Sequence, residues 1–185
     1  SIMKKLIDDL LILSELDDME ISSEKLEISI KKLFLRLYNS SRQLNKKNHE
    51  IIINRDKNYN LLGDEYSIFS AILNLVNNSI RHTPSGTKIE ITWIVNSKKE
   101  GILEVEDNGN GIESHHLPYL AERFYRVDRS RSRDSGGSGL GLSIVKNIAL
   151  KHEAKLQVKS KIGHGSKFSI KFPAERIKKI VYSND

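Results

Sequence analysis

The order in which helical and strand periodicities follow one another restricts the fold of this chain more than any single motif. Apolar residues three or four apart predict helices over residues 1–18, from about 22, from 64 and from 140. Alternating apolar residues predict strands at 49–56, 88–96, 102–107, 155–160 and 167–172. Two pairs of successive strands are close enough along the chain to form hairpins. This order predicts an α+β fold, a two-layer sandwich with helices on one face of a mixed sheet.

The beginning of the chain is predicted to be a separate helical unit. Its apolar residues follow heptad spacing, so we expect residues 1–18 to pack against other helices. Ser22 and Ser23 are candidate caps for the next helix, whose apolar positions are Leu26, Ile30, Leu33 and Leu37. We therefore expect a helical stub at 1–18, a domain at 19–174 and a charged C-terminal tail at 175–185.

The composition excludes several classes of protein. The 185 residues suffice for one domain and the stub, and the lack of cysteine excludes disulfides and thiolate metal sites. The net charge of +6 is spread along the chain without interleaved aromatic residues, which argues against a nucleic-acid surface. Because no apolar run approaches the ~18 residues of a membrane span and the chain begins within a helical pattern, we expect a soluble piece of a longer protein.

A glycine-rich segment, residues 136–141, opens the last predicted helix. Glycines at a helix start bring backbone N–H groups to a phosphate, since those donors are unpaired and the helix dipole is positive there. The spacing of a P-loop is present, but Leu142 occupies the position of its lysine. Gly137, Gly139 and Gly141 lack the spacing of a dinucleotide-binding fold. The segment is therefore another kind of anion loop or, alternatively, a flexible linker.

The predicted helix from residue 64 contains an unusual group of polar residues. Asn74 and Asn78 are four apart and share one face, and Arg81 and His82 lie about one turn further on. Carboxamide oxygens are suitable ligands for Mg²⁺, which fills its shell with waters and phosphate oxygens. A solvated polar face explains the same spacing equally well.

Two glycine-containing turns lie at the ends of predicted strands. In DNGNGI, residues 107–112, Asp107 can accept a hydrogen bond from an exocyclic amino group, while the glycines let a flat ring approach the backbone. GHGSKF, residues 163–168, offers the hydroxyl group of Ser166. Both segments are also ordinary turn sequences. Between them, residues 113–138 have little periodicity, and a loop of this length in a compact domain is usually functional. We therefore expect a lid there.

These segments occur in the order found in one family. The asparagine helix, Asp-x-Gly-x-Gly, the lid, Gly-x-Gly-x-Gly at a helix start and a final Gly-x-Gly resemble the ATP-binding domain of sensor histidine kinases. The broader family includes gyrase, mismatch-repair and chaperone ATPases. The resemblance covers residues 20–173, and residues 1–18 resemble the end of the second helix of the kinase dimerisation hairpin. ERFYRVDRSRSRDSGGSGLGLSIVK and NLVNNSIRHTPSGT are similar to segments of phosphate-regulon sensor kinases.

The resemblance implies a role for each segment in binding ATP and Mg²⁺. Asp107 would hold the adenine, and Asn78 would hold the metal. Arg126 in the lid would be the catalytic residue that reaches the terminal phosphate. His82 stands where tyrosine is common, and Ser166 where threonine is commoner. The residues implied to contact the nucleotide are Asn74, Asn78, Arg81, His82, Asp107, Gly109, Gly111, Ile112, Arg126, Ser138, Gly139, Leu140, Gly141, Leu142 and Ser166.

The resemblance also implies an activity and partners. The γ-phosphoryl group of ATP would pass to a histidine on the dimerisation hairpin and then to the receiver domain of a response regulator, in phosphate-starvation signalling. The full-length protein would be a homodimer in the bacterial inner membrane, with this domain facing the cytoplasm. Related hydrolases place a glutamate where Asn74 stands, and a neutral amide cannot act as a general base towards water.

One part of a complete kinase is not found in this sequence. None of its 6 histidines has the His-Glu/Asp-x-x-x-Pro setting of a phosphoacceptor. We therefore expect the chain to bind ATP without phosphorylating itself. Two alternatives stay open at this point: a nucleotide-gated interaction module, and an ATPase that transfers no phosphoryl group to histidine.

Overall fold

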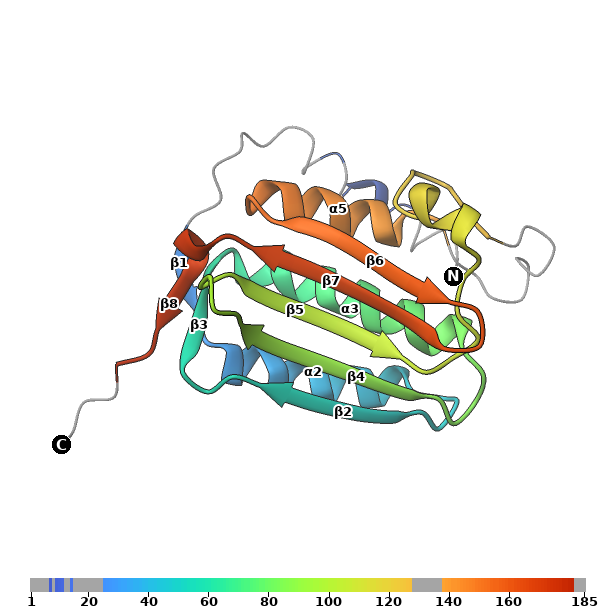
Figure 1. The fold of residues 1–185 in the computed structure, drawn as a ribbon, viewed down its shortest axis with the longest axis horizontal. Helices are drawn as coiled ribbons and strands as arrows, with labels where there is room; N and C mark the ends of the chain where they lie inside the picture. The colour runs from blue at the N-terminus through green and yellow to red at the C-terminus, as the bar shows by residue number, and fades with distance from the viewer. Residues whose placement is uncertain (1–6, 8, 12–13, 15–24, 128–137, 182–185) are drawn as a thin grey trace.

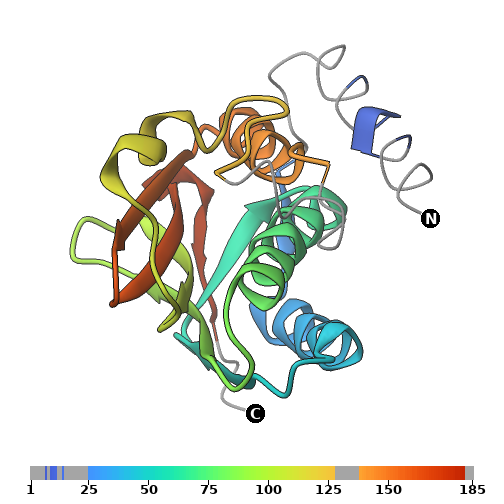
Figure 2. The same ribbon diagram turned by 90° about the vertical axis from the view of Figure 1, so that its right-hand side faces the viewer.

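The computed structural model describes residues 7, 9–11, 14, 25–127 and 138–181, and within them a sheet and a layer of helices form two layers (Figures 1 and 2). The five-stranded sheet has the order β2-β4-β5-β7-β6. Strands β2 and β4 are parallel and the other neighbours antiparallel. Its strands are β2 (Glu50–Arg55), β4 (Lys88–Val95), β5 (Gly101–Asp107), β6 (Lys155–Lys161) and β7 (Gly165–Phe172). The predicted α+β two-layer sandwich is confirmed.

Helices α2 (Ile30–Leu44), α3 (Glu65–His82) and α5 (Gly141–Lys151) pack on one face of this sheet (Figure 2). The side chain of Asp64 accepts hydrogen bonds from the backbone N–H groups of Tyr66 and Ser67, so it caps α3 as predicted. The first N–H groups of α5 have no such side-chain cap. They are therefore free to bind an anion.

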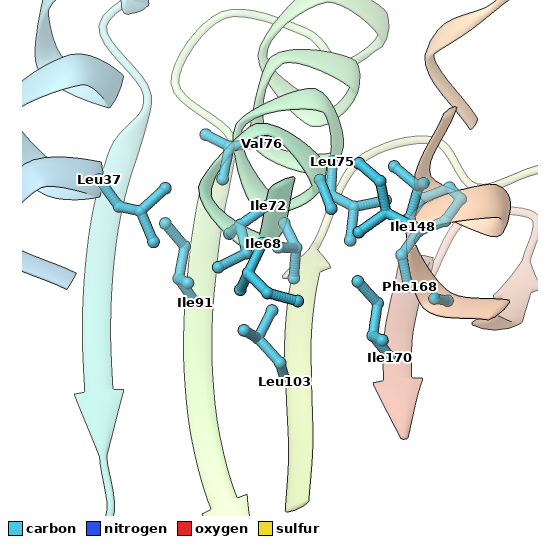
Figure 3. Packing of buried hydrophobic residues seen from close by; sticks show 14 of the residues in the cluster. Leu37, Ile68, Ile72, Leu75, Val76, Ile91, Leu103, Ile148, Phe168 and Ile170 are labelled. Atoms are coloured by element: carbon cyan, nitrogen blue, oxygen red, sulfur yellow. The ribbon is translucent and has the colours of Figure 1, made fainter. Parts of the chain in front are cut away.

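The core lies between the helices and the sheet (Figure 3). Ile68, Ile72 and Leu75 of α3 are fully buried and lie towards the buried side chains of the central strands. Their spacing places them on one face of the helix, whose other face carries the asparagines. The same burial that fixes α3 on the sheet therefore fixes where its polar face points.

A second, three-stranded sheet differs from the prediction. It has the order β1-β3-β8 and consists of β1 (Leu26–Ile28), β3 (Tyr59–Gly63) and β8 (Ile177–Lys179). Leu26, predicted to be helical, lies in β1 and is exposed, and α2 is capped by Ser29. The helical assignment of Leu26 was wrong because pairing with β3 outweighs a short local periodicity. Ser22 and Ser23 lie outside the described residues.

Two further segments are more ordered than expected. The lid contains a 3-10 helix, η1 (Ser114–Tyr119), and its residues 128–137 lie outside the described part of the chain. The expected charged tail begins instead with η2 (Ala174–Arg176) and β8. Arg176 is 2% exposed, and its Nε donates to Glu153 Oε2 over 3.1 Å. This basic residue is therefore part of the folded domain and does not belong to a solvent-exposed tail.

None of the helices in the described part of the chain combines the length and the hydropathy that a membrane span needs. The helical stub is described only at residues 7, 9–11 and 14, which are helical.

A buried histidine connects two of the helices. His152 follows α5, is 1% exposed and donates from Nδ1 to the carbonyl oxygen of Ile148. Its Nε2 accepts a hydrogen bond from the backbone N–H of Asp64, the cap of α3, over 3.1 Å. A carbonyl can only accept and an N–H can only donate, so both bonds together require the neutral imidazole. Burial lowers the pKa of His152, and the charge of Arg176 lowers it further.

We expect the domain to lose stability when the pH falls below about 6.5. The pKa of His152 is lower in the folded than in the unfolded chain. The unfolded chain therefore binds more protons in this window, and the free energy of unfolding falls by up to about 1.4 kcal/mol per pH unit for one proton. Chemical denaturation at several pH values measures this slope. His152→Gln should flatten it, whereas His164→Gln in an exposed turn should not. An equal slope in His152→Gln would contradict the assignment.

Candidate functional site

A row of polar side chains crosses the helix-facing side of the sheet at one end. Asp107, the last residue of β5, lies opposite Ser166 of β7, and Ser166 lies opposite Ser160 of β6. Directly opposed residues of neighbouring strands point to the same face. The three side chains therefore line one strip beneath the helices.

The carboxylate of Asp107 is held on both oxygens. Its Oδ2 accepts a hydrogen bond from Ser79 Oγ of α3 over 3.0 Å, and its Oδ1 accepts one from the N–H of Gly109 over 3.1 Å. Asp107 is 4% exposed, and this burial raises its pKa, while the bonds from Gly109, Ser79 and the backbone of Ser166 oppose the rise. The carboxylate is thus fixed in orientation in a desolvated position, as recognition of a hydrogen-bond donor on a ligand requires.

The glycines beside Asp107 allow unusually close backbone contacts. At Gly165, φ is +87°, and an added Cβ would lie 1.8 Å from the carbonyl oxygen of Asp107. At Gly109 it would lie 2.5 Å from Thr83 Cγ2. A larger residue would require the backbone at Asp107 to move if it replaced Gly165, and Thr83 at the end of α3 to move if it replaced Gly109.

The asparagines of α3 lie beside the start of α5. An added Cβ on Gly141 would lie 3.2 Å from Asn74 Oδ1, so the asparagine helix and the second glycine segment meet there. Asn74 Nδ2 donates to the carbonyl oxygen of Ser70 over 3.0 Å, which leaves Oδ1 towards α5. Within the described residues, no hydrogen bond engages the side chain of the partly buried Asn78.

Basic side chains gather at the C-terminal end of α3. Desolvation lowers the pKa of His82, and the charges of Arg81, Arg126 and Lys47 lower it further, although part of the side chain is exposed. Lys47 Nζ donates to the carbonyl oxygens of Arg81 and Thr83 over 2.8 and 3.0 Å. The lid arginine Arg126 therefore lies within electrostatic range of α3, and the cluster favours an anion.

The lid is joined to the second glycine segment. The N–H of Phe124 donates to the carbonyl oxygen of Gly139 over 3.0 Å. Gly139 has a φ of +74°, and an added Cβ would lie 2.9 Å from Phe124 Cα. Phe124 itself has a φ of +64°, an uncommon conformation for a bulky residue, and such strain is concentrated at functional sites.

Ser138 connects this segment to the helical stub. Its Oγ donates to Asp9 Oδ2 over 2.7 Å and accepts from the N–H of Leu140 over 3.3 Å. Asp9 is 6% exposed. A carboxylate of the stub thus lies directly beside the start of α5.

Most of the predicted site residues lie around the ends of α3 and β5 and the start of α5. Some of them offer a side chain to a ligand, and others only their backbone. Leu140 is fully buried in the core, so only its backbone faces the site. Leu142 and Ile112 are partly buried against the core. The described residues contain no cluster of three or more His, Asp or Glu side chains that could hold a metal. A metal at the asparagine helix would therefore need phosphate oxygens and waters as further ligands.

Sequence reasoning missed Ser79, Ser160 and Lys47. A serine beside Asn78 in the last turn of a predicted helix was the one available signal for Ser79, which the structure shows to be 2% exposed and bonded to Asp107. Ser160 lies in a lysine-rich strand and gave no such signal. Neither did Lys47, because its partners are backbone carbonyls.

Comparison with known proteins gives a consistent result. Residues 63–176 match the family model of the histidine kinase-, DNA gyrase B- and HSP90-like ATPases. The chain is similar to the phosphate regulon sensor protein PhoR of Pseudomonas aeruginosa, with 37% identity over 94% of this chain and 39% of that protein. It is 44% identical to PhoR of Haemophilus influenzae over 70% of this chain and 30% of that protein.

The solved structures agree on the fold. Full-length ShkA in complex with AMPPNP superposes with a TM-score of 0.81 at 20% identity, over 96% of this chain and 36% of that one. At this identity the likeness concerns the fold alone. The chain spans only 39% and 30% of the two curated relatives.

Proposed function

The chain belongs to the histidine kinase-, DNA gyrase B- and HSP90-like ATPase family, and from this premise we propose that it is the ATP-binding catalytic domain of a sensor histidine kinase. The observation that carries the proposal is the meeting of three segments at one place. Asp107 is fixed at one end of the site, and Asn74 Oδ1 lies beside the start of α5. The positive charge of Arg126 reaches the end of α3, where it lowers the pKa of His82. A fixed carboxylate suits the amino group of adenine, amide oxygens suit the metal, and positive charge suits the phosphates.

At the adenine end, a buried carboxylate selects a donor. The adenine ring carries an exocyclic amino group, and Asp107 is the acceptor that we assign to it. Ser166, opposite Asp107 and 7% exposed, supplies a second polar group. Gly109 and Gly111 line the turn that follows Asp107.

At the phosphate end, Asn78 and Asn74 fit Mg²⁺. Their amide oxygens are hard ligands, and the side chain of Asn78 makes no hydrogen bond among the described residues. The bound ion would neutralise part of the charge on the phosphates. Arg81 and Arg126 add positive charge, and the backbone between Ser138 and Leu142, including the first N–H groups of α5, which have no side-chain cap, can bind phosphate oxygens.

The side chain at position 74 favours transfer over hydrolysis. Asn74 Oδ1 faces the start of α5, where the phosphates would lie. An amide has no basic lone pair near neutral pH, so Asn74 cannot activate water. The terminal phosphate is then kept for a stronger nucleophile, which we propose is a histidine of the dimerisation hairpin, with Arg126 stabilising the charge that develops during transfer.

The rest of the proposal concerns the longer protein. The similarity to PhoR supports a role in phosphate-limitation signalling. The partners that follow are a second copy of the protein, whose hairpin carries the acceptor histidine, and the receiver domain of a response regulator. A membrane anchor outside this chain would place the domain in the cytoplasm.

We expect the isolated chain to bind ATP and remain unlabelled by radioactive ATP. It should transfer label once a separate dimerisation hairpin with the acceptor histidine is added with Mg²⁺. The reason is that the chain contains no histidine in an acceptor setting. Gel autoradiography measures the transfer, and acid lability of the label identifies phosphohistidine.

Matched variants give the controls for this experiment. Arg126→Ala should slow labelling of the hairpin, while Arg42→Ala, an exposed arginine of α2, should not. Label on the isolated chain would contradict the expectation that it does not phosphorylate itself, whereas ATP binding without any transfer to the hairpin would contradict the kinase assignment. The second result would indicate an ATP-gated binding module.

A further inference from the structure

One side chain at the adenine end has no role in the proposed site, although it contacts both glycine turns. Ser160 of β6 accepts a hydrogen bond from the N–H of Ile112, at the end of the first turn, over 2.8 Å. Its Oγ lies 2.8 Å from the carbonyl oxygen of Gly165 and 3.0 Å from Ser166 Oγ. Three partners therefore surround a single hydroxyl group.

The number of protons and lone pairs fixes the direction of every bond. A serine hydroxyl has one proton and two lone pairs. The carbonyl oxygen of Gly165 can only accept, so the proton of Ser160 must point to it. The N–H of Ile112 occupies one lone pair of Ser160. Only one lone pair is left for Ser166, so Ser166 must donate its proton to Ser160.

This arrangement determines what Ser166 offers to a ligand. With its proton committed to Ser160, the Ser166 hydroxyl can act towards the site only as an acceptor. The neighbouring group, Asp107, is an acceptor as well. Two adjacent acceptors match the 6-amino group of adenine and repel the 6-oxo group of guanine or hypoxanthine, because buried polar groups without partners are costly.

We propose that Ser160 is a positioning residue that makes the site selective for 6-amino purines by holding the Ser166 hydroxyl as an acceptor. The inference rests on the proposed function, since it assumes that the base lies against Asp107 and Ser166. Ser160 itself lies one strand further from Asp107 and acts through Ser166.

The test compares ATP with ITP, which differ at the 6-position of the base, an amino group in ATP and an oxo group in ITP, and at N1, which carries a proton only in ITP. Dissociation constants of both nucleotides with Mg²⁺ are measured by calorimetry on the whole chain. In Ser160→Ala, the Ser166 hydroxyl can rotate and donate to the 6-oxo group. The ratio of the ITP to the ATP dissociation constant should therefore fall roughly tenfold, about the effect of one hydrogen bond.

Three further variants distinguish positioning of Ser166 from a nonspecific structural disturbance of the site. Ser160→Thr keeps the hydroxyl and should keep the ratio. Ser169→Ala, which removes a hydroxyl of β7 bonded to Glu104, should also keep it. In a Ser166→Ala background, adding Ser160→Ala should leave the ratio unchanged, because Ser160 acts only through Ser166.

Two outcomes would overturn the inference, and they are distinguishable from failure of the proposed function. If Ser160→Ala weakens ATP and ITP equally, or still changes the ratio when Ser166 is alanine, Ser160 is merely structural. If Ser160→Ala does not fold, the ratio in Ser160→Cys decides, since a thiol is a much weaker acceptor for the Ser166 proton. If the unaltered chain binds neither nucleotide, the proposed function itself is wrong and this inference falls with it.

Discussion

Asp107→Asn is expected to weaken ATP binding about 10- to 100-fold, the effect of losing a hydrogen bond to a charged acceptor. The amide of asparagine still accepts through one oxygen, but its NH₂ group meets Ser79 Oγ or the N–H of Gly109, which hold the carboxylate in place. One of the acceptor positions facing the adenine amino group is thereby lost. Calorimetric titration with ATP and Mg²⁺ measures the change.

The same substitution should not weaken the fold. Burial raises the pKa of Asp107, so the folded domain loses stability as the pH rises from about 4 through that pKa. At neutral pH the buried charge therefore costs stability, and a neutral amide removes that cost. We expect an unchanged or higher melting temperature. Loss of binding without loss of stability distinguishes a binding residue from a structural one.

Glu106→Gln is the matched control for Asp107→Asn. Glu106 is the preceding residue, is exposed and pairs with Lys167 over 2.8 Å. The Glu106→Gln variant should bind ATP like the unaltered chain, because exposed ion pairs contribute little to stability. If Asp107→Asn bound ATP normally, the base would lie elsewhere.

Gly165→Ala should lower the free energy of unfolding by about 3–5 kcal/mol. The new Cβ would lie 1.8 Å from the carbonyl oxygen of Asp107 and 2.8 Å from Asn108 Cα, both backbone atoms that cannot rotate away. The φ of +87° adds the cost of a left-handed conformation. Because the backbone at Asp107 must shift, ATP binding should be lost as well. Urea denaturation and calorimetry measure the two effects.

Gly163→Ala separates backbone strain from steric overlap. Gly163 lies in the same turn with a φ of +77°, but nothing lies within 4 Å of an added Cβ. Only the conformational cost remains, about 1–2 kcal/mol, and ATP binding should be retained. Equal destabilisation by the two alanines would mean that the turn relaxes and that the contact with Asp107 is unimportant.

Local signals were sufficient to predict most helices and strands. The cap at Asp64 and the apolar face of α3 lie within one segment, so sequence alone located this helix. The small sheet was missed because β1 and β8 have three residues each and exist only through pairing with β3. Strands this short carry too few residues for an alternating pattern.

The site shows the same division between local and long-range information. The glycines and Asp107 belong to short motifs, so the sequence alone indicates them as candidates. Ser79 was missed because its partner is 28 residues away, and Ser160 because its function depends on the count of lone pairs at one hydroxyl. Such information exists only once the strands have paired.

The bond from Ser138 to Asp9 joins groups 129 residues apart. Ser138 lies where the phosphates are proposed to bind, so its hydroxyl cannot serve a phosphate oxygen and the carboxylate at once. Two ligands that compete for one group are linked, and the linkage is reciprocal. Nucleotide binding weakens the contact of the stub with Ser138 by a certain free energy. Displacement of the stub strengthens nucleotide binding by the same free energy. A movement of the stub away from Ser138 therefore increases nucleotide binding, and nucleotide binding in turn favours the displaced position of the stub.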